Sequence, residues 1–262
     1  MIISFIIEIL VLLREFEVVM ENIWDKKAET YAKFDTNLNE FGQNLFKFIE
    51  DEGINFANKS VIDIGAGTGV YSLYIATLGA KLYALDSAKA MLGVLKNSAQ
   101  KYGINVEQII NDDFANFTQK NELKFDIAFL SMSPALRTKQ DFDMFLNLAK
   151  RKIYVNWASE RNSSMLSPIF AHFGIKKSSL NLTTQNFELN LKNKNIPYKS
   201  REISERRIQR RNLSQAVQNA LWHLGVNGAN ISEKALENLL EKQVKNGIIT
   251  DEINATFKAF II

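Results

Sequence analysis

A strand-like run that ends in a glycine-rich turn constrains this chain more than any other feature. Residues 61–69 read Val-Ile-Asp-Ile-Gly-Ala-Gly-Thr-Gly, and a second apolar run, residues 81–85, ends in Asp86. Residues 61–64 are too apolar for an exposed strand and are typical of a central parallel one. Glycines permit a sharp turn and a close backbone approach, because they carry no Cβ. A strand, a glycine turn, a helix and a strand-end carboxylate together predict a site for a nucleoside-containing cofactor.

The spacing of the turn argues against a dinucleotide. A dinucleotide loop has its third glycine three positions after the second, whereas the glycines here are Gly65, Gly67 and Gly69. Asp63 precedes them, and a carboxylate repels a pyrophosphate but attracts an ammonium group. Asp86 can accept two hydrogen bonds from a ribose diol. The two carboxylates favour a cofactor with a cationic group and a ribose.

The pattern Asp-x-Gly-x-Gly-x-Gly over residues 63–69 resembles motif I of the class I S-adenosylmethionine-dependent methyltransferases. In that family the acidic residue helps hold the methionine end of the cofactor, and the carboxylate after the second strand binds the ribose hydroxyls. Residues 106–114 are similar to the third strand and the acidic turn that reads adenine. Residues 124–132 resemble the fourth strand, whose end meets cofactor and substrate. Residues 24–31 resemble an upstream segment in which a tyrosine closes over the methionine end.

The resemblance covers residues 22–157 well and the remainder loosely. Asp113 and Phe114 match the adenine-reading pair, with Asp112 as the alternative to Asp113. The positions that the resemblance assigns to S-adenosylmethionine are Tyr31, Asp63, Gly65, Ala66, Gly67, Thr68, Gly69, Asp86, Ser87, Met91, Asp113, Phe114 and Ser131. The alternative is an ordinary αβ turn whose carboxylates only cap helices. That alternative explains one such residue easily and three strand-end carboxylates poorly.

Alternating helical and strand patterns favour an α/β fold. The apolar periodicity and the stop signals predict helices over residues 38–53, 70–79, 88–103 and 141–150, and strands over 61–64, 81–86, 106–110, 125–131 and 153–157. Such alternation gives a parallel sheet with helices on both faces. With the resemblance, it predicts a doubly wound, seven-stranded, mostly parallel sheet. Its last strand, near residues 257–262, is expected to be antiparallel and to lie beside the fifth.

The carboxyl-terminal part of the chain gives weaker signals. Helices are predicted over residues 164–173, 213–224, with Ser214 as the N-cap, and 232–247. A loop over residues 181–197 is expected to belong to a lid-like elaboration near residues 160–212. Residues 22–262 are predicted to form a single domain, because no repeat or low-complexity linker separates a second one.

Residues 1–21 are expected to be an N-terminal extension. Their apolar run is too short for a transmembrane helix and lacks the features of a signal peptide. A mis-assigned start, with Met20 as the natural initiator, is the preferred interpretation. The alternative is a short helix that covers the active site or forms a dimer contact.

The composition excludes several kinds of chemistry. The chain has no cysteine, so disulfides and thiolate sites are impossible. It has only two histidines and no cluster of ligands near them, so no metal site is expected. A net charge of +3 does not by itself imply a nucleic-acid partner. We expect a cytoplasmic protein without a membrane partner, and the oligomeric state stays open.

Candidates for the chemical step are few. Trp157, at the end of the fifth predicted strand, could line the substrate site. His172 could be a base, but a packed structural role is favoured, and His223 is more strongly favoured as structural. The segment Ser131-Met-Ser-Pro lacks the Asn or Asp of DNA amino-methyltransferases, which argues against that class. The catalytic residue is therefore unknown.

Residues 192–211 are the most basic stretch and include Arg206, Arg207, Arg210 and Arg211. A solvated face is the preferred interpretation, and attraction of an anionic substrate or an RNA backbone is the alternative. We predict methyl transfer by in-line displacement to a small-molecule acceptor. The other hypotheses are an RNA or protein methyltransferase that uses the basic segment, and a catalytically silent cofactor-binding protein.

Overall fold

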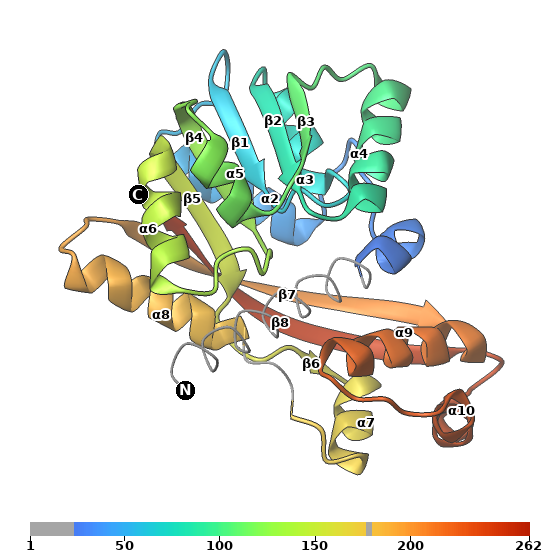
Figure 1. Cartoon of the computed structure of the whole chain (residues 1–262). Helices are drawn as coiled ribbons and strands as arrows, with labels where there is room; N and C mark the ends of the chain where they lie inside the picture. Colours follow the sequence, from blue (N-terminus) through green and yellow to red (C-terminus); the bar gives the residue numbers. More distant parts are fainter. Residues whose placement is uncertain (1–23, 177–179) are drawn as a thin grey trace, which may run out of the picture. The chain divides into compact units, whose positions relative to one another are not determined.

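The computed structural model describes residues 24–176 and 180–262 (Figure 1). Its contacts divide the chain into two compact units. Among the described residues, the first contains those from Trp24 to Asn37 and Ile54–Ile153, and the second contains Leu38–Gly53 and those from Tyr154 to Ile262. The predicted extension, residues 1–21, lies outside the described residues. The single domain over residues 22–262 and its lid stay predictions.

The first unit is built on a parallel sheet. Its strands are β1 (Ser60–Ile64), β2 (Lys81–Asp86), β3 (Gln108–Asn111), β4 (Phe125–Ser131) and the start of β5 (Ala149–Trp157), in the order β3-β2-β1-β4-β5. Strand β1 pairs in parallel with β2 and β4, and β2 pairs in parallel with β3. In this register Asp63 lies opposite Ala84 on one side and Phe129 on the other. The carboxyl ends of four strands therefore meet at one edge of the sheet.

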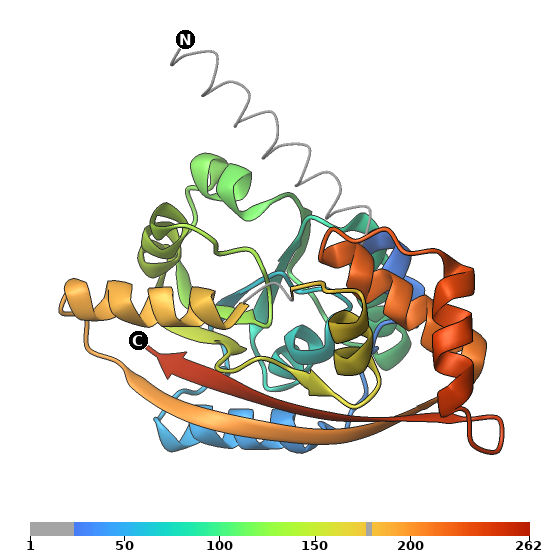
Figure 2. The same cartoon turned by 90° about the horizontal axis from the view of Figure 1, so that it is seen from below.

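Helices cover both faces of this sheet. They are the 3-10 turn η1 (Ala28–Thr30) and the α-helices α3 (Val70–Thr77), α4 (Lys89–Tyr102), α5 (Phe114–Lys120) and α6 (Lys139–Leu148). The two views place α3 and α4 on one face and α5 and α6 on the other (Figures 1 and 2). Leu73, Leu95 and Leu82 are buried in the core between α3, α4 and the sheet. Burial of such side chains contributes roughly 1.5–3 kcal/mol each.

The second unit combines antiparallel strands with helices. Its elements are α2 (Glu40–Asp51), the end of β5, β6 (Asn162–Ser163), α7 (Leu166–His172), α8 (Leu180–Asn193), β7 (Lys199–Arg211), α9 (Leu213–Val226), α10 (Glu233–Leu240), η2 (Glu241–Gln243) and β8 (Ile249–Ile261). Strand β8 follows β5 in the strand order, and it pairs antiparallel with both β6 and β7. Alternate residues of β8 are buried, and Phe257 contacts Phe41 of α2 at 4.6 Å between ring centroids. A separate hydrophobic core cluster contains Ile249 of β8 and buried residues of α7, α9 and α10.

The predicted fold class is confirmed: the sheet is mostly parallel, and its last strand is antiparallel. The described residues form eight strands instead of seven, because β6 and β7 were not predicted and β8 begins well before residue 257. The loop predicted over residues 181–197 is wrong, since most of it belongs to α8. Helix α9 begins at Leu213, as predicted, but the prediction of Ser214 as its N-cap is wrong. Its N-cap is Asn212, which accepts a hydrogen bond from the Gln215 amide at 2.9 Å, and Ser214 lies inside the helix.

Candidate functional site

The glycine turn after β1 takes the backbone conformation for which glycine is needed. Gly65, Gly67 and Gly69 have φ angles of +72°, +55° and +85°, in the left-handed region that side chains disfavour. The amides of Gly65 and Ala66 both donate to the Leu85 carbonyl, at 2.8 and 3.0 Å. The turn is therefore fixed to the end of β2 before it continues into α3.

The surroundings of the three glycines differ. A Cβ on Gly65 would lie 2.0 Å from Ser133 Oγ and 2.5 Å from Ser133 Cβ, and one on Gly69 would lie 2.7 Å from Leu95 Cγ. A Cβ on Gly67 would meet no atom within 4 Å. Two glycines thus accommodate neighbouring protein atoms, whereas the backbone at Gly67 faces open space that a ligand can occupy.

Asp63 is a buried acid beneath this turn. Only 3% of the residue is exposed, and its carboxylate accepts a short hydrogen bond from Ser72 Oγ of α3. Burial raises the pKa of Asp63 to about 7, against the lowering effect of the Ser72 bond, and the charge of Asp86 adds to the rise. A cation bound nearby would stabilise the ionised form.

Asp86 links the ends of β1, β2 and β3. Its carboxylate accepts from the Gly67 amide and the Ala88 amide, both at 2.8 Å. Asn111, opposite Asp86 in the sheet, donates from Nδ2 to the carbonyls of Asp86 and Ser87 at 3.1 and 2.8 Å. A carboxylate has about four acceptor sites, so these two amide bonds leave capacity for a diol. Asn111 was not predicted as a site residue, and its only sequence signal is a polar side chain at a strand end.

The acidic turn after β3 stabilises the start of helix α5. Asp113 is the N-cap of α5 and accepts from the Asn116 amide at 2.8 Å. Asp112 accepts from the Asp113 amide at 3.0 Å and lies 3.6 Å from Lys120 Nζ. Phe114 is buried at the start of α5. The structure thus brings this turn to the same sheet edge as Asp86. The carboxylates of Asp112 and Asp113 both have partners within the protein.

The upstream segment contacts the turns that follow β1 and β2. Thr68 donates a short hydrogen bond to the Ala32 carbonyl, and Asp25 accepts from the Ala90 amide at 2.8 Å. Met91 is buried in a cluster that includes Ala28, with Trp24 packed against it. Tyr31 is 38% exposed and makes an edge contact with the Trp24 ring at 5.9 Å. Tyr31 is thus placed near the site with an accessible side chain.

The end of β4 is strained. Met132 has a φ of +53°, a costly conformation for a side chain of this kind that recurs at functional sites. Ser131 Oγ is buried and has no hydrogen-bond partner in the part of the chain that the structure describes. Ser133 is buried against Gly65 and accepts from the Ala135 amide at 3.2 Å. The resemblance placed Ser133 at the strand end that meets cofactor and substrate, but its close approach to Gly65 was not predicted, because nothing in the local sequence indicates it.

The other candidates for chemistry belong to the second unit. Trp157 is half-buried, and its ring contacts the Phe257 ring in a tilted arrangement, with the ring centroids 4.5 Å apart. His172 is the last residue of α7 and is exposed, so the expectation of a packed histidine is wrong there. It fails because only one face of this short helix is buried. His223 is half-buried in the last turn of α9, beside Trp222.

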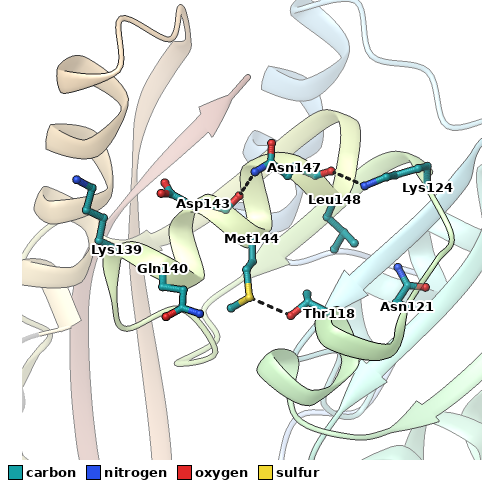
Figure 3. Close-up of a pocket in the computed structure, with 9 residues that line it drawn as sticks. All are labelled: Thr118, Asn121, Lys124, Lys139, Gln140, Asp143, Met144, Asn147 and Leu148. Atoms are coloured by element: carbon teal, nitrogen blue, oxygen red, sulfur yellow. Dashed lines mark hydrogen bonds between the residues drawn. The ribbon is translucent and has the colours of Figure 1, made fainter.

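A hollow of about 580 Å³ lies elsewhere in the first unit (Figure 3). Its lining residues are Thr118, Asn121, Lys124, Lys139, Gln140, Asp143, Met144, Asn147 and Leu148. They come from α5, α6 and the amino end of β4, whereas the glycine turn follows the carboxyl end of β1. Because β1 and β4 are parallel, the hollow and the turn lie toward opposite edges of the sheet. The hollow is not part of the candidate site.

Two general features bear on the kind of site. Over residues 24–176 and 180–262, no three His, Cys, Asp or Glu side chains are grouped so that they could hold a metal ion. In the same ranges, every helix is too short or too polar to span a bilayer.

Comparison with known proteins agrees with this geometry. Residues 61–153 match the family model described as a methyltransferase domain. The ubiquinone biosynthesis O-methyltransferase of Pseudomonas fluorescens is 32% identical over 93 residues, which are 36% of this chain and 38% of that protein. The enzyme of the same name from Pseudoalteromonas translucida is 27% identical over 113 residues, 43% of this chain and 45% of that protein. The chain thus matches less than half of the length of these relatives.

The fold has a solved counterpart over most of the chain. The crystal structure of precorrin 8W decarboxylase from Methanobacterium thermoautotrophicum superposes with a TM-score of 0.52 at 12% identity. The superposition covers 89% of this chain and 97% of that one. At this identity the likeness concerns the fold alone.

Proposed function

We propose a function for this chain from one premise: its residues 61–153 belong to the class I S-adenosylmethionine-dependent methyltransferases. The protein binds S-adenosylmethionine at the carboxyl ends of β1, β2 and β3 and transfers its methyl group to a small-molecule acceptor. The observation that carries this proposal is the open backbone at Gly67, whose amide donates to the carboxylate of Asp86.

Each part of the site suits one part of this cofactor. The buried carboxylate of Asp63 favours the cationic methionine end, because a nearby positive charge stabilises its ionised form. Asp86 retains acceptor capacity for the ribose hydroxyls. The Asp113–Phe114 turn is proposed to hold adenine. Because the Asp113 carboxylate caps α5, its contribution to adenine binding uses the remaining acceptor sites or the backbone.

The remaining predicted residues are proposed to complete the binding site for S-adenosylmethionine. Ala66 and Thr68 belong to the turn, and Ser87 and Met91 flank the start of α4. Tyr31, exposed beside Trp24, is proposed to cover the methionine end. Ser131 supplies a buried hydroxyl at the end of β4. None of these residues is assigned as a catalytic base.

The cofactor supplies an electrophilic methyl group on a sulfonium. When bound, the cofactor would give this methyl to the acceptor atom as the carbon–sulfur bond breaks, and would leave as a neutral thioether. An acceptor that arrives protonated would lose its proton to solvent, since no residue is assigned as a base. The protein positions the two reactants in line and keeps water from the reacting atoms. The names of the curated relatives favour an oxygen nucleophile on a small molecule. Neither RNA nor protein acceptors have a specific observation in their favour.

Substitution of Gly67 tests the cofactor site. Gly67→Ala should fold, with a loss of roughly 1–2 kcal/mol from the left-handed backbone, because its Cβ meets no protein atom within 4 Å. It should bind S-adenosylmethionine at least about tenfold more weakly by titration calorimetry, because the methyl group fills the ligand space. Gly103→Ala is the matched control, since Gly103 has a φ of +64°, equally open surroundings and a place at the end of α4. Equal affinities in the two variants would contradict the proposal.

A labelling experiment tests the acceptor class. The protein is incubated with methyl-labelled S-adenosylmethionine and fractionated extract of its source. Label in small molecules supports the proposal, whereas label in RNA or protein contradicts the small-molecule acceptor. Cofactor binding without any transferred label would favour a catalytically silent binding protein.

A further inference from the structure

The carboxylate of Asp113, in the acidic turn after β3, already binds a residue of its own helix at both oxygens. Asp113 is the N-cap of α5. Its Oδ1 accepts a hydrogen bond from the backbone amide of Asn116 at 2.8 Å. Its Oδ2 accepts a short hydrogen bond from Nδ2 of the Asn116 side chain. One residue, Asn116, therefore supplies a donor to each oxygen of this carboxylate.

These two hydrogen bonds differ in how easily each can be given up. The Asn116 backbone amide lies in the first turn of α5, where amides have no partner within the helix, so the bond to Oδ1 is a cap that the helix needs. The side-chain amide has no such need, because Asn116 is exposed and water can replace Oδ2 as its acceptor. The bond to Oδ2 can thus break while the cap stays intact.

The Asn116 side chain offers the same kind of donor as the base of the proposed cofactor. An asparagine amide donates from an NH2 group on a planar carbon. Adenine likewise donates from an NH2 group on a flat ring. Two such groups at one oxygen bring hydrogens of like partial charge together, so each weakens the bond of the other. Asn116 and adenine are therefore rivals for Asp113 Oδ2.

The neighbouring acid, Asp112, does not offer an equivalent acceptor. One of its oxygens accepts from the Asp113 amide at 3.0 Å, and the other lies 3.6 Å from Lys120 Nζ. A charged ammonium is a stronger partner for a carboxylate than a neutral amine is, so adenine would not readily replace Lys120. In this turn, Asp113 Oδ2 is thus the acceptor whose present partner can be exchanged for another neutral NH2 group.

We propose that Asn116 competes with the adenine amine of S-adenosylmethionine for Asp113 Oδ2 and so lowers the affinity for the cofactor. Binding of adenine turns the Asn116 side chain out to solvent, and release of the cofactor lets it return. This inference rests on the proposed function, because it requires adenine at the acidic turn. One exposed hydrogen bond favours the closed turn by about three- to tenfold, and it raises the apparent dissociation constant of the cofactor by a similar factor.

Removal of the side chain tests the competition. Asn116→Ala keeps the backbone amide that binds Oδ1, and alanine is a better helix former than asparagine, so the variant should fold. It should bind S-adenosylmethionine about three- to tenfold more tightly than the wild type does by titration calorimetry. Unchanged affinity would overturn the proposal. Weaker binding would also overturn it, because Asn116 would then support Asp113 instead of competing for it.

A matched variant at the other end of α5 serves as the control. Asn121 is the C-cap of this helix, and its side chain donates to the Leu123 carbonyl at 2.8 Å and accepts from the Leu123 amide at 3.2 Å. Asn121→Ala removes the same functional group without freeing Asp113, so it should bind S-adenosylmethionine as the wild type does. Equal gains in the two variants would overturn the assignment to Asn116.

A cofactor analogue separates competition for a hydrogen bond from simple obstruction. In this analogue of S-adenosylmethionine, a hydrogen atom replaces the exocyclic amine of adenine, so the ligand makes no bond to Asp113 Oδ2. The gain in affinity of Asn116→Ala should disappear with this analogue. An equal gain for both ligands would overturn the proposal, because Asn116 would then only fill space. Absence of S-adenosylmethionine binding in the wild type would overturn the proposed function as well, whereas wild-type binding without a gain in the variant contradicts this inference alone.

Discussion

Asp63 is subject to two opposite influences on its ionisation. Burial favours the neutral acid and raises its pKa to about 7. A positive charge on a bound ligand favours the carboxylate. The proposed cofactor should therefore bind more tightly as the pH rises toward 7, because binding then requires less proton release from Asp63.

The same residue predicts how stability changes with pH. Its pKa is raised from 3.8 in the unfolded chain to about 7 in the fold. The stabilisation is thus fully present below pH 3.8 and is lost as the pH rises from there through 7, by about 2 kcal/mol between pH 5 and pH 7. Asp63→Asn, which stays neutral and can still accept from Ser72, should not show this loss. Urea unfolding at pH 5, 7 and 8 measures it, and parallel profiles for the two proteins would contradict the assignment.

Gly65 and Ser133 form a close pair whose coupling can be measured. Gly65→Ala should cost roughly 2–4 kcal/mol, because its Cβ would lie 2.5 Å from Ser133 Cβ and the residue has a φ of +72°. The double variant Gly65→Ala with Ser133→Gly should recover the steric part and retain about 1–2 kcal/mol of backbone strain. Denaturant unfolding of the two single variants and the double variant provides the cycle. If the losses in the free energy of unfolding were additive, the side chains at positions 65 and 133 would not be in contact.

At the scale of elements, one buried acid joins β8 to the segment around β6. Asp251 binds Ser163, the Met165 amide and Arg211, and it is fully buried. Its neighbour in the strand, Glu252, faces the other side and pairs with Arg206. Adjacent residues of like charge thus have unlike environments.

Substitution of Asp251 and of Glu252 should change the free energy of unfolding by different amounts, because the two environments differ. Asp251→Ala should lower the free energy of unfolding by roughly 3–5 kcal/mol, because it leaves the mostly buried Arg211 without its carboxylate. Glu252→Ala should change it by no more than about 1 kcal/mol, since the Glu252–Arg206 pair is exposed. Chemical denaturation at neutral pH compares the two. Similar losses would mean that Asp251 is no more important than a surface acid.

At the scale of the whole molecule, the second unit is not continuous in sequence. Helix α2 precedes every strand of the first unit, yet it packs in the second. Its Phe41 contacts Phe257 of β8, its Phe48 ring lies 4.5 Å from the Arg201 guanidinium, and its Asp51 pairs with Arg201 at 3.1 Å. The two units therefore cannot be separated by a single cut.

A truncated chain tests this arrangement. A chain that ends at Trp157 loses β7 and β8, so the apolar face of α2 should be exposed and the helix should lose its protection from hydrogen exchange. The amides of β1 and β4 serve as the internal control, because their pairing partners remain. If the amides of residues 40–51 stayed fully protected from hydrogen exchange in the truncated chain, the assignment of α2 to the second unit would be contradicted.

Elements that depend on interactions between residues close in sequence could be predicted, whereas elements that depend on contacts between distant residues could not. The core of the first unit follows from local signals: apolar runs give β1 and β4, and glycines mark the turn after β1 and the end of α4 at Gly103. Asp63 and Asp86 could be placed together, because parallel strands bring their carboxyl ends to one edge. The acidic turn was located correctly, whereas the capping role of Asp113 requires knowledge of α5.

The second unit was harder to predict because its pairings are non-local. Strand β7 has only two apolar residues among its charges, and its strand conformation depends on pairing with β8 over its whole length. Helix α8 is rich in Asn and Thr, which are poor helix formers, so its sequence resembled a loop. The face of the sheet on which each arginine of β7 lies follows only from the register of β7 with β8.

The place of α2 in the chain also affects how the protein is made. On a ribosome, α2 emerges roughly 150 residues before β7, and at about 5–20 residues per second this is an interval of roughly 7–30 s. During that time its phenylalanines have none of their final neighbours in the second unit. The first unit can complete its parallel sheet in the same interval. The nascent chain should therefore present α2 as an early target for chaperones that recognise short apolar helices.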